Sequence, residues 1–386
     1  MNTRESQETQ QMQQTLVRTA FAGLAKLWDE ERGGFKDALR ESGEGLSVVE
    51  SKKLNYNCAC LIALLDYLRD SKRAGEAERY CRAQARYLLS RFEKTGFPVP
   101  SFENATQRDA TVGEQGLLLW ALSKSLAAGV APKNAARRAC EELAEKIARA
   151  IDERDGVPQT LGSRYFVPMD NAFCLRGLIE SERAGVSGKG ETAADAIASA
   201  LIDDAATPPV FRVTKNRETT NRISFNNLVY PLYSLSDYAS TRKNAGARAR
   251  ETVAACAEAL AAEQGPLGQW WWTYDRFGGI AMRYPVYGVH QDGMAPMALK
   301  RASAALGSPT RFDAAIEKSL RWVFGENELR ARLVDEERGV VWRSIRCPWL
   351  VQKLRQVTGF TPEVFLRVKK ECRSYHLAWI LHAAKC

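Results

Sequence analysis

The sequence predicts an all-α protein: a single α/α toroid of six helix hairpins, with six inner helices inside six outer ones. Three observations predict this fold. Apolar residues recur with a period near 3.6 along almost the whole chain, and the alternation typical of strands is nearly absent. Charged, amphipathic segments alternate with largely apolar ones. Short polar clusters open the apolar segments, and the first four recur at intervals of 57, 56 and 56 residues (Asn57, Glu114, Asp170, Asn226).

A helix that is apolar on most faces is buried, so the apolar segments are expected to form the inner barrel. We expect these inner helices around 55–70, 112–128, 169–184, 225–239, 291–306 and 374–385. The amphipathic segments are expected to form the outer helices around 10–28, 75–93, 133–152, 190–204, 247–263 and 311–330. Residues 1–386 are predicted to be one domain. We expect 1–9 to be flexible and 264–290 and 331–373 to be enlarged loops at the mouth.

Composition narrows the class of protein. With 45% hydrophobic and 26% charged residues, the chain of 386 residues is typical of globular proteins. No apolar run reaches the roughly 18 to 20 residues of a membrane helix, and the polar N-terminus lacks the core of a secretory signal, so a cytoplasmic protein is expected. The nine cysteines are scattered without zinc-binding spacing. We therefore expect buried thiols rather than a disulfide framework, and neither a metal nor a cofactor.

The net charge of +9 favours anionic ligands in general. No nucleic-acid-binding motif accompanies this charge, so nucleic acid is not an expected partner. The basic 343–373 segment suggests amphipathic helices that cover the mouth or rest on a protein partner or an anionic membrane surface, although plain surface helices explain the pattern too.

The segment 264–296, QGPLGQWWWTYDRFGGIAMRYPVYGVHQDGMAP, is unusually aromatic and is interrupted by glycine and proline. Such a loop is an aggregation hazard unless it lines a cavity or packs on a core. Side chains alternate along an extended chain, so the three consecutive tryptophans cannot all face one way. The substrate-binding candidates from this segment are Trp270, Trp271, Trp272, Tyr274, Asp275, Arg283, Tyr284 and Tyr287.

A ring of six hairpins with buried alternate helices resembles the α/α-toroid superfamily, which includes six-hairpin glycosidases, polysaccharide lyases and the terpenoid-cyclase and prenyltransferase toroids. The resemblance covers nearly the whole chain. It implies that the inner helices run in one direction, so that their N-terminal ends and the polar clusters meet at one mouth.

Acid–base chemistry at this mouth requires carboxyl groups in different environments, or a carboxyl group with a histidine. The catalytic candidates are Asp292, Glu114, Asp170 and His290. The three carboxyl groups also have structural interpretations: Glu114 completes a capping box with Thr111, and Asp170 and Asp292 cap their helices. Amide groups both donate and accept, which suits sugar hydroxyls, so the further candidates are Asn57, Gln115, Asn171, Asn227 and Gln291, with Trp342, Arg343 and His376 from the last unit.

These residues predict a carbohydrate-active enzyme, a hydrolase, lyase or epimerase that acts on an oligosaccharide or anionic glycan. Two alternatives stay open. Gln264-x3-Gly268-x-Trp270 looks like the QW motif of squalene and oxidosqualene cyclases, which favours a terpenoid cyclase or prenyl-diphosphate enzyme. A non-catalytic toroid that binds a glycan or a partner protein within a biosynthetic complex is the other alternative.

Overall fold

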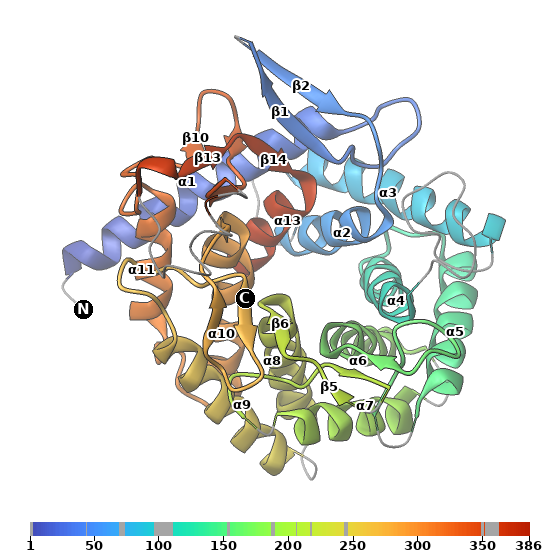
Figure 1. The fold of residues 1–386 in the computed structure, drawn as a ribbon. Helices are drawn as coiled ribbons and strands as arrows, with labels where there is room; N and C mark the ends of the chain where they lie inside the picture. Colours follow the sequence, from blue (N-terminus) through green and yellow to red (C-terminus); the bar gives the residue numbers. More distant parts are fainter. Residues whose placement is uncertain are drawn as a thin grey trace.

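The structure is a computed structural model, and it describes residues 3–43, 45–68, 74–95, 111–152, 155–186, 190–205, 207–216, 218–242, 246–348, 351 and 363–386. Its helices form two concentric rings (Figure 1). The inner ring consists of α2 (Leu54–Leu68), α4 (Val112–Ala127), α6 (Pro168–Arg183), α8 (Asn226–Thr241), α10 (Ala295–Ala305), which is preceded by the π-helical turn η2 (His290–Met294), and α13 (Ser374–Ala383). The outer ring consists of α1 (Thr3–Leu27), α3 (Ala74–Thr95), α5 (Lys133–Ala150), α7 (Gly190–Asp204), α9 (Gly246–Ala262) and α11 (Asp313–Val323).

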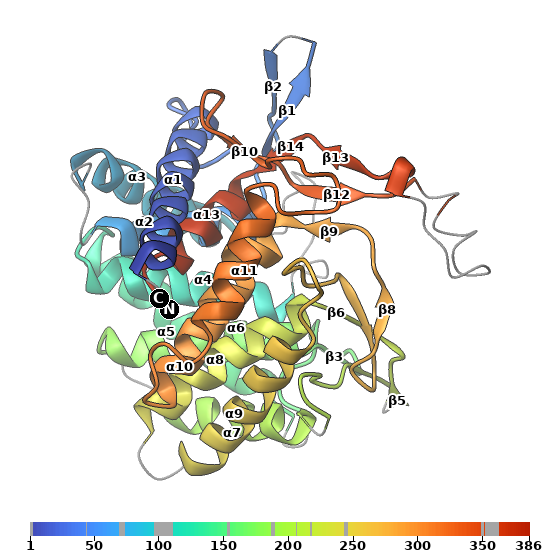
Figure 2. The same cartoon turned by 90° about the vertical axis from the view of Figure 1, so that its left-hand side faces the viewer.

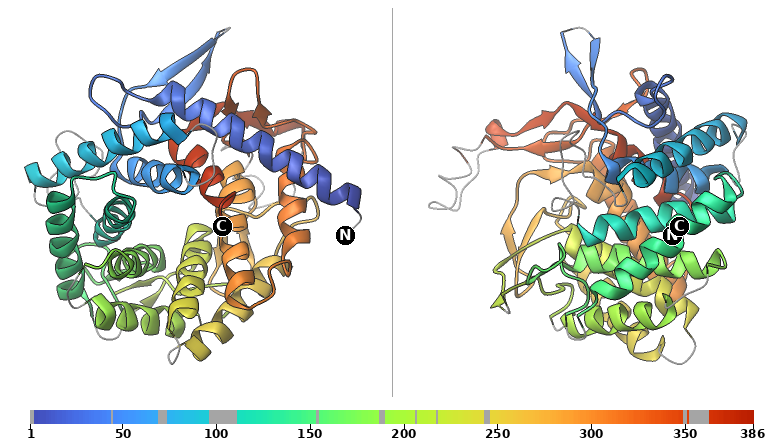
Figure 3. Two further views of the ribbon diagram at one scale, coloured as in Figure 1. Left: turned by 180° about the vertical axis from the view of Figure 1, so that it is seen from behind. Right: turned by 90° about the vertical axis from the view of Figure 1, so that its right-hand side faces the viewer.

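Each inner helix contacts the next, and α13 contacts both α2 and η2, so the inner ring is closed. Seen from behind, the outer helices wrap around this ring (Figure 3). The predicted all-α toroid is therefore confirmed, and the helix bounds agree with the expected ones to within a few residues at most ends. Two differ: α1 is helical from Thr3, within the stretch expected to be flexible, and α11 ends at Val323.

Short antiparallel strands occur where the sequence suggested only loops. They are β1 (Ala38–Ser42), β2 (Gly45–Val49), β3 (Tyr165–Phe166), β4 (Thr214–Lys215), β5 (Glu218–Thr219), β6 (Arg222–Ser224), β7 (Thr273–Asp275), β8 (Ile280–Met282), β9 (Val286–Tyr287), β10 (Val334–Asp335), β11 (Val340–Val341), β12 (Ser344–Arg346), β13 (Arg367–Lys369) and β14 (Glu371–Arg373). Strands of two to five residues are too short to show a period of two in the sequence.

Most of these strands lie at one end of the ring (Figure 2). They join connections that are distant in sequence, because β12 pairs with both β9 and β13, and β1 pairs with β14. Strand β9 of the 264–290 segment therefore forms one sheet with β12 and β13 of the 331–373 segment. Residues 349–350 and 352–362 of the basic 343–373 segment lie outside the described part of the chain.

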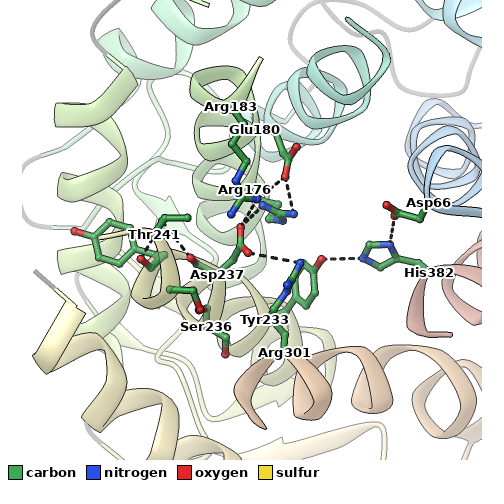
Figure 4. Close-up of polar contacts among 12 residues, drawn as sticks. Asp66, Arg176, Glu180, Arg183, Tyr233, Ser236, Asp237, Thr241, Arg301 and His382 are labelled. Atoms are coloured by element: carbon green, nitrogen blue, oxygen red, sulfur yellow. Dashed lines mark hydrogen bonds and ion pairs between the residues drawn. The ribbon is translucent and has the colours of Figure 1, made fainter. Parts of the chain in front are cut away.

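A buried polar network lies between the C-terminal halves of the inner helices (Figure 4). The Arg176 guanidinium, 2% exposed, pairs with Asp237 and Glu180. Asp237 also contacts Arg183 and Arg301, and these charges hold its pKa at about 2 although burial alone would raise it. These contacts fix the neighbouring inner helices α6, α8 and α10 to one another.

The core is continuous around the ring and contains eight of the nine cysteines as buried side chains, as the sequence predicted. Among the described helices, none combines the length and the apolar character that crossing a membrane requires.

Candidate functional site

A cavity of about 370 Å³ lies at the N-terminal ends of the inner helices. Its acidic wall contains Thr111, Glu114 and Asp170, and its basic wall contains Arg343 and Arg373. The lining also includes Tyr56, Phe173, Tyr230, Trp272, Tyr287, Tyr375 and Trp379, together with Asn55, Gln159, Asn226 and His290. The mouth predicted from the repeat is therefore a real cavity, and its volume falls in the range of about 300–1,000 Å³ usual for small-molecule sites.

Glycines bring the two acidic side chains of the site together. A Cβ atom on Gly113 would lie 2.1 Å from Oδ1 of Asp170, and one on Gly116 would lie 2.4 Å from the backbone nitrogen of Cys174. The first turns of α4 and α6 can pack this closely only because these positions have no side chain. The close approach places Asp170 against the turn that carries Glu114.

Asp170 is the most perturbed of these carboxyl groups. It is 3% exposed, and within the described part of the chain its Oδ2 atom has no hydrogen-bond partner. Burial, with a contribution from the charge of Glu114, raises the pKa of Asp170 to about 8. Asp170 therefore retains its proton at pH 7. The capping interpretation of this residue is wrong, because α6 begins at Pro168 and its N-cap is Val167.

Glu114 has a structural role as well as a place in the cavity. The predicted capping box is confirmed: Oε2 of Glu114 accepts a hydrogen bond from the backbone N–H of Thr111 at 3.3 Å, and the Thr111 hydroxyl accepts one from the backbone N–H of Glu114 at 3.0 Å. Burial raises the pKa of Glu114, and the Thr111 hydrogen bond opposes this rise. Because the two carboxyl groups interact, the more buried Asp170 is the one that holds a proton to higher pH.

His290 contributes a neutral imidazole to the cavity. Its ring stacks on Phe225 at 4.4 Å and on Trp272 at 5.5 Å between ring centres. Burial lowers the pKa of His290 to about 3, to which the neighbouring His376 contributes. An imidazole with so low a pKa is uncharged at pH 7 and is a weak base.

Asp292 and His376 lie behind the cavity lining and bind each other. The His376 ring nitrogen Nε2 is 2.9 Å from Oδ1 and 3.0 Å from Oδ2 of Asp292, and both residues are buried. Burial raises the pKa of Asp292, and the contact with His376 opposes this rise. Asp292 lies inside η2 rather than at a helix cap. The π turn thus directs His290 toward the cavity and Asp292 toward α13.

Of the three consecutive tryptophans, only Trp272 lines the cavity. Trp270 is fully buried, and its indole N–H donates to the carbonyl of Leu260 at 2.8 Å. Trp271 is 4% exposed, with the Tyr284 ring packed edge-on against it and the Arg283 guanidinium 5.6 Å from its ring centre. Trp270 and Trp271 therefore pack away from the cavity and Trp272 faces it, so the three side chains do not all point one way.

Three predicted amides hold connections instead of facing the cavity. Oδ1 of Asn57 accepts from the backbone N–H of Phe35 at 2.7 Å, and its Nδ2 donates to the carbonyl of the same residue at 3.1 Å. Asn171 makes the same pair of bonds to Val157, at 2.8 and 3.4 Å, and Gln291 makes it to Trp270, at 2.9 and 3.0 Å. The polar clusters thus include a repeated amide that fixes the connection from the preceding outer helix.

The remaining candidates also lie outside the cavity lining. Asn227 accepts from the backbone N–H of Met169, Tyr274 accepts from that of Trp271, and Asp275 closes a turn by accepting from Phe277 and Gly279. Gln115 and Trp342 are buried. The structure brings together Glu114, Asp170, His290, Trp272, Tyr287 and Arg343 from the predicted set.

Several cavity residues were not selected from the sequence. Phe173, Tyr230 and Trp379 lie three or four residues after Asp170, Asn226 and Tyr375, so they face the same side of their helices one turn deeper. This spacing was a usable signal. Arg373 precedes the last inner helix directly, in a place comparable to that of the polar clusters.

The comparisons with known proteins concern the fold. No protein family matches the sequence, and no curated protein matches it either. A solved cellobiose 2-epimerase from Bacillus thermoamylovorans is similar over 98% of both chains, with a TM-score of 0.74 and 13% identity. A D-mannose isomerase covers 96% of both chains with a TM-score of 0.70 and 12% identity. An α-1,6-mannanase from Salegentibacter covers 97% of both with a TM-score of 0.59 and 11% identity. These neighbours are all built as rings of helix hairpins, and this chain has the α/α-toroid fold that the sequence predicted.

Proposed function

We propose that this protein is a carbohydrate-active enzyme that binds a sugar in the mouth cavity and uses Asp170 as its proton donor. The observation that carries the proposal is the carboxyl group of Asp170, which is buried at the cavity, lacks a partner for Oδ2 among the described residues, and retains its proton at neutral pH. A carboxylic acid kept neutral in this way is what protonation of a glycosidic oxygen requires.

The cavity walls suit a sugar ring better than an isoprenoid. Trp272, Tyr287 and Trp379 offer flat aromatic faces for stacking, while Asn55, Gln159 and Asn226 supply amides for hydroxyl groups. A carbocation pocket needs an apolar enclosure, but this cavity has carboxyl groups on one wall and guanidinium groups on another. We therefore retain the carbohydrate hypothesis in preference to the terpenoid one.

Among hydrolysis, elimination and epimerisation, the protonation states favour hydrolysis. Abstraction of a carbon-bound proton requires a base with a pKa near the working pH, and the pKa of about 3 makes His290 a poor base for that step. Hydrolysis requires an acid that keeps its proton, which Asp170 supplies, and a second carboxylate, which Glu114 supplies. We assign Asp292 and His376 a positioning role, because they hold η2 against α13 behind His290.

The solved neighbours support the carbohydrate class. One is a sugar epimerase from a ruminal bacterium, and another is an α-amylase from Clostridium perfringens. A form of the Salegentibacter mannanase with two consecutive aspartates replaced is inactive and is seen in complex with α-1,6-mannotriose. An anionic oligosaccharide as substrate, a cytoplasmic location and a protein partner on the basic 343–373 segment belong to the proposal as well, and they rest on charge and composition.

The test is turnover of a panel of oligosaccharides by the wild type, Asp170→Asn and Glu114→Gln. General acid–base catalysis contributes about 10²- to 10⁴-fold, so Asp170→Asn should lose at least about 100-fold in kcat. Asp203→Asn, in the outer helix α7, is the matched control and should keep wild-type turnover. Unchanged turnover in both site variants would refute the assignment.

The same panel separates the alternatives. An isoprenoid enzyme would be stabilised against heat by farnesyl diphosphate and not by sugars. A non-catalytic toroid would bind a glycan equally well with or without Asp170 and would turn over none of the panel.

A further inference from the structure

The basic wall of the cavity is built around one buried carboxylate that is outnumbered by cations. Glu371 is 2% exposed and forms ion pairs with four side chains. Its oxygens lie 2.7 Å from Nε of Arg373, 2.8 Å from Nη1 of Arg343, 3.0 Å from Nε of Arg40 and 3.6 Å from Nζ of Lys369. One negative charge thus faces four positive ones.

The pKa shifts report the same imbalance. Burial alone would raise the pKa of Glu371, but the Arg373 hydrogen bond and the surrounding positive charges hold it at about 2. Burial and the charges of Arg343, Arg373 and Arg346 lower the pKa of Lys369, although Glu371 lies beside it and opposes the change. Burial is the largest cause of this fall, and the three arginine charges add to it.

Two of these cations face the cavity, and two do not. Arg343 and Arg373 line it, whereas Arg40 and Lys369 contact Glu371 from outside the lining. The Arg343 guanidinium lies 5.1 Å from the centre of the Tyr287 ring, and within the described chain its Nε atom has no partner. Arg373 is held by Glu371 and by the Tyr56 hydroxyl, to which its Nη1 donates at 2.7 Å.

The basic wall lies across the cavity from the proton donor. Contacts run from α13 to α2, α4 and α6 in turn, so α6 and α13 are opposite members of the inner ring. Asp170 lies in the first turn of α6, and Arg373 directly precedes α13. The cavity is therefore charged positively on one side and carries a neutral carboxylic acid on the other.

We propose that Arg343 and Arg373 form a subsite for an anionic substituent of the sugar, so that the substrate is an acidic glycan bearing a carboxylate, sulfate or phosphate group. The guanidinium forks suit these planar or tetrahedral oxyanions, and the excess positive charge compensates for their desolvation. Binding of the anion at this wall orients the ring so that another part of the glycan meets Asp170. The inference rests on the proposed function, because it places the same substrate in the same cavity.

The experiment measures binding to an array of acidic and neutral oligosaccharides that share the same ring types. It uses the full chain with Asp170→Asn, so that turnover does not interfere. Acidic glycans should bind at least tenfold more tightly than their neutral counterparts, and the carboxylated, sulfated and phosphorylated members identify the anion. Raising the salt concentration from about 0.05 to 0.5 M should weaken binding of the acidic members and leave the neutral members unchanged.

Arginine variants locate the binding. Arg343→Gln and Arg373→Gln should each weaken acidic-glycan binding about 10- to 100-fold, because each removes a charge-assisted hydrogen bond. Arg40→Gln is the comparison, because it also removes a partner of Glu371 but does not line the cavity, so it should weaken acidic-glycan binding much less than either of the other two variants. Unfolding temperatures of the three variants show whether a loss of binding is caused by a loss of folded protein. If a variant does not fold, the salt dependence of glycan binding by the Asp170→Asn protein tests the anion subsite instead.

The anion subsite would be overturned if neutral glycans bound as tightly as acidic ones. It would also be overturned if Arg343→Gln and Arg373→Gln kept full affinity for acidic glycans. The proposed function has a different failure. Turnover of a neutral glycan that depends on Asp170 would sink the subsite alone, whereas arginine-dependent binding of an acidic glycan whose turnover survives Asp170→Asn would sink the catalytic proposal alone.

Discussion

Replacing Asp170 with asparagine should stabilise the protein at neutral pH, even though we expect it to abolish activity. The carboxyl group has a pKa of about 8 in the folded protein, compared with the ordinary value of 3.8. At pH 7 the unfolded chain has released this proton and the folded chain has not. The two states differ in this way over the roughly three pH units between the ordinary pKa of aspartate and pH 7. At about 1.36 kcal/mol per pH unit, the wild type loses about 4 kcal/mol that the amide, which does not ionise, retains.

The direction of this stability change follows from proton binding. Between about pH 4 and pH 8 the folded state binds one more proton at this site than the unfolded state does, so stability falls as the pH rises. The stability difference between Asp170→Asn and the wild type should therefore be near zero at pH 4, grow through pH 7 and level off above about pH 8. Because Oδ2 of Asp170 has no hydrogen-bond partner in the described chain, the amide loses no bond there.

The assay is urea unfolding of both proteins at several pH values. Asp237→Asn is the control of opposite sign: its carboxylate, with a pKa of about 2, pairs with Arg176, and removing its charge leaves the buried Arg176 guanidinium with Glu180 as its remaining ion-pair partner. This variant should lose about 3–5 kcal/mol at pH 7. A stability difference for Asp170→Asn that is absent at pH 7, or that does not shrink toward pH 4, would refute the reasoning about the proton.

Three further outcomes are expected. Activity should fall about tenfold per pH unit above about pH 8 as Asp170 loses its proton, and a pH–rate profile checks this. Gly113→Ala should lower the free energy of unfolding by about 1–3 kcal/mol and remove much of the activity, because its Cβ would meet the Asp170 carboxyl group. Gly75→Ala, which has open space around its Cβ, should change neither. Unfolding and rate measurements on the two variants test this. Trp270→Ala should lose about 3–5 kcal/mol of stability, while Trp272→Ala should chiefly weaken glycan binding, which calorimetry distinguishes.

The fold was accessible from the sequence because its signals extend over whole helices. A repeat near 56 residues and an apolar period of 3.6 are each supported by many residues, so single exceptions do not matter. The helix pairs and their inner and outer order follow from those two patterns, and the common mouth is what the resemblance to the α/α-toroid superfamily implies. The short strands of the mouth carry no comparable signal, because each contains only two to five residues.

The site was only partly accessible, because a polar cluster spans several directions around its helix. Successive helical residues point about 100° apart. Asp170 therefore reaches the cavity while Asn171 binds the connection at Val157, and the sequence alone does not say which neighbour does which. At the fifth unit a π turn changes this rotation, so that His290 faces the cavity and Asp292 faces α13.

Titration of the Asp170 carboxyl group by ¹³C NMR tests the central claim most directly, because it needs no substrate. The spectra of the wild type and Asp170→Asn identify the signal, and Glu114→Gln removes the neighbouring charge. The buried proton donor predicts a midpoint near pH 8 that moves down in Glu114→Gln, because that charge contributes to the raised pKa. A midpoint below about pH 5, within the ordinary range of aspartate, would contradict it.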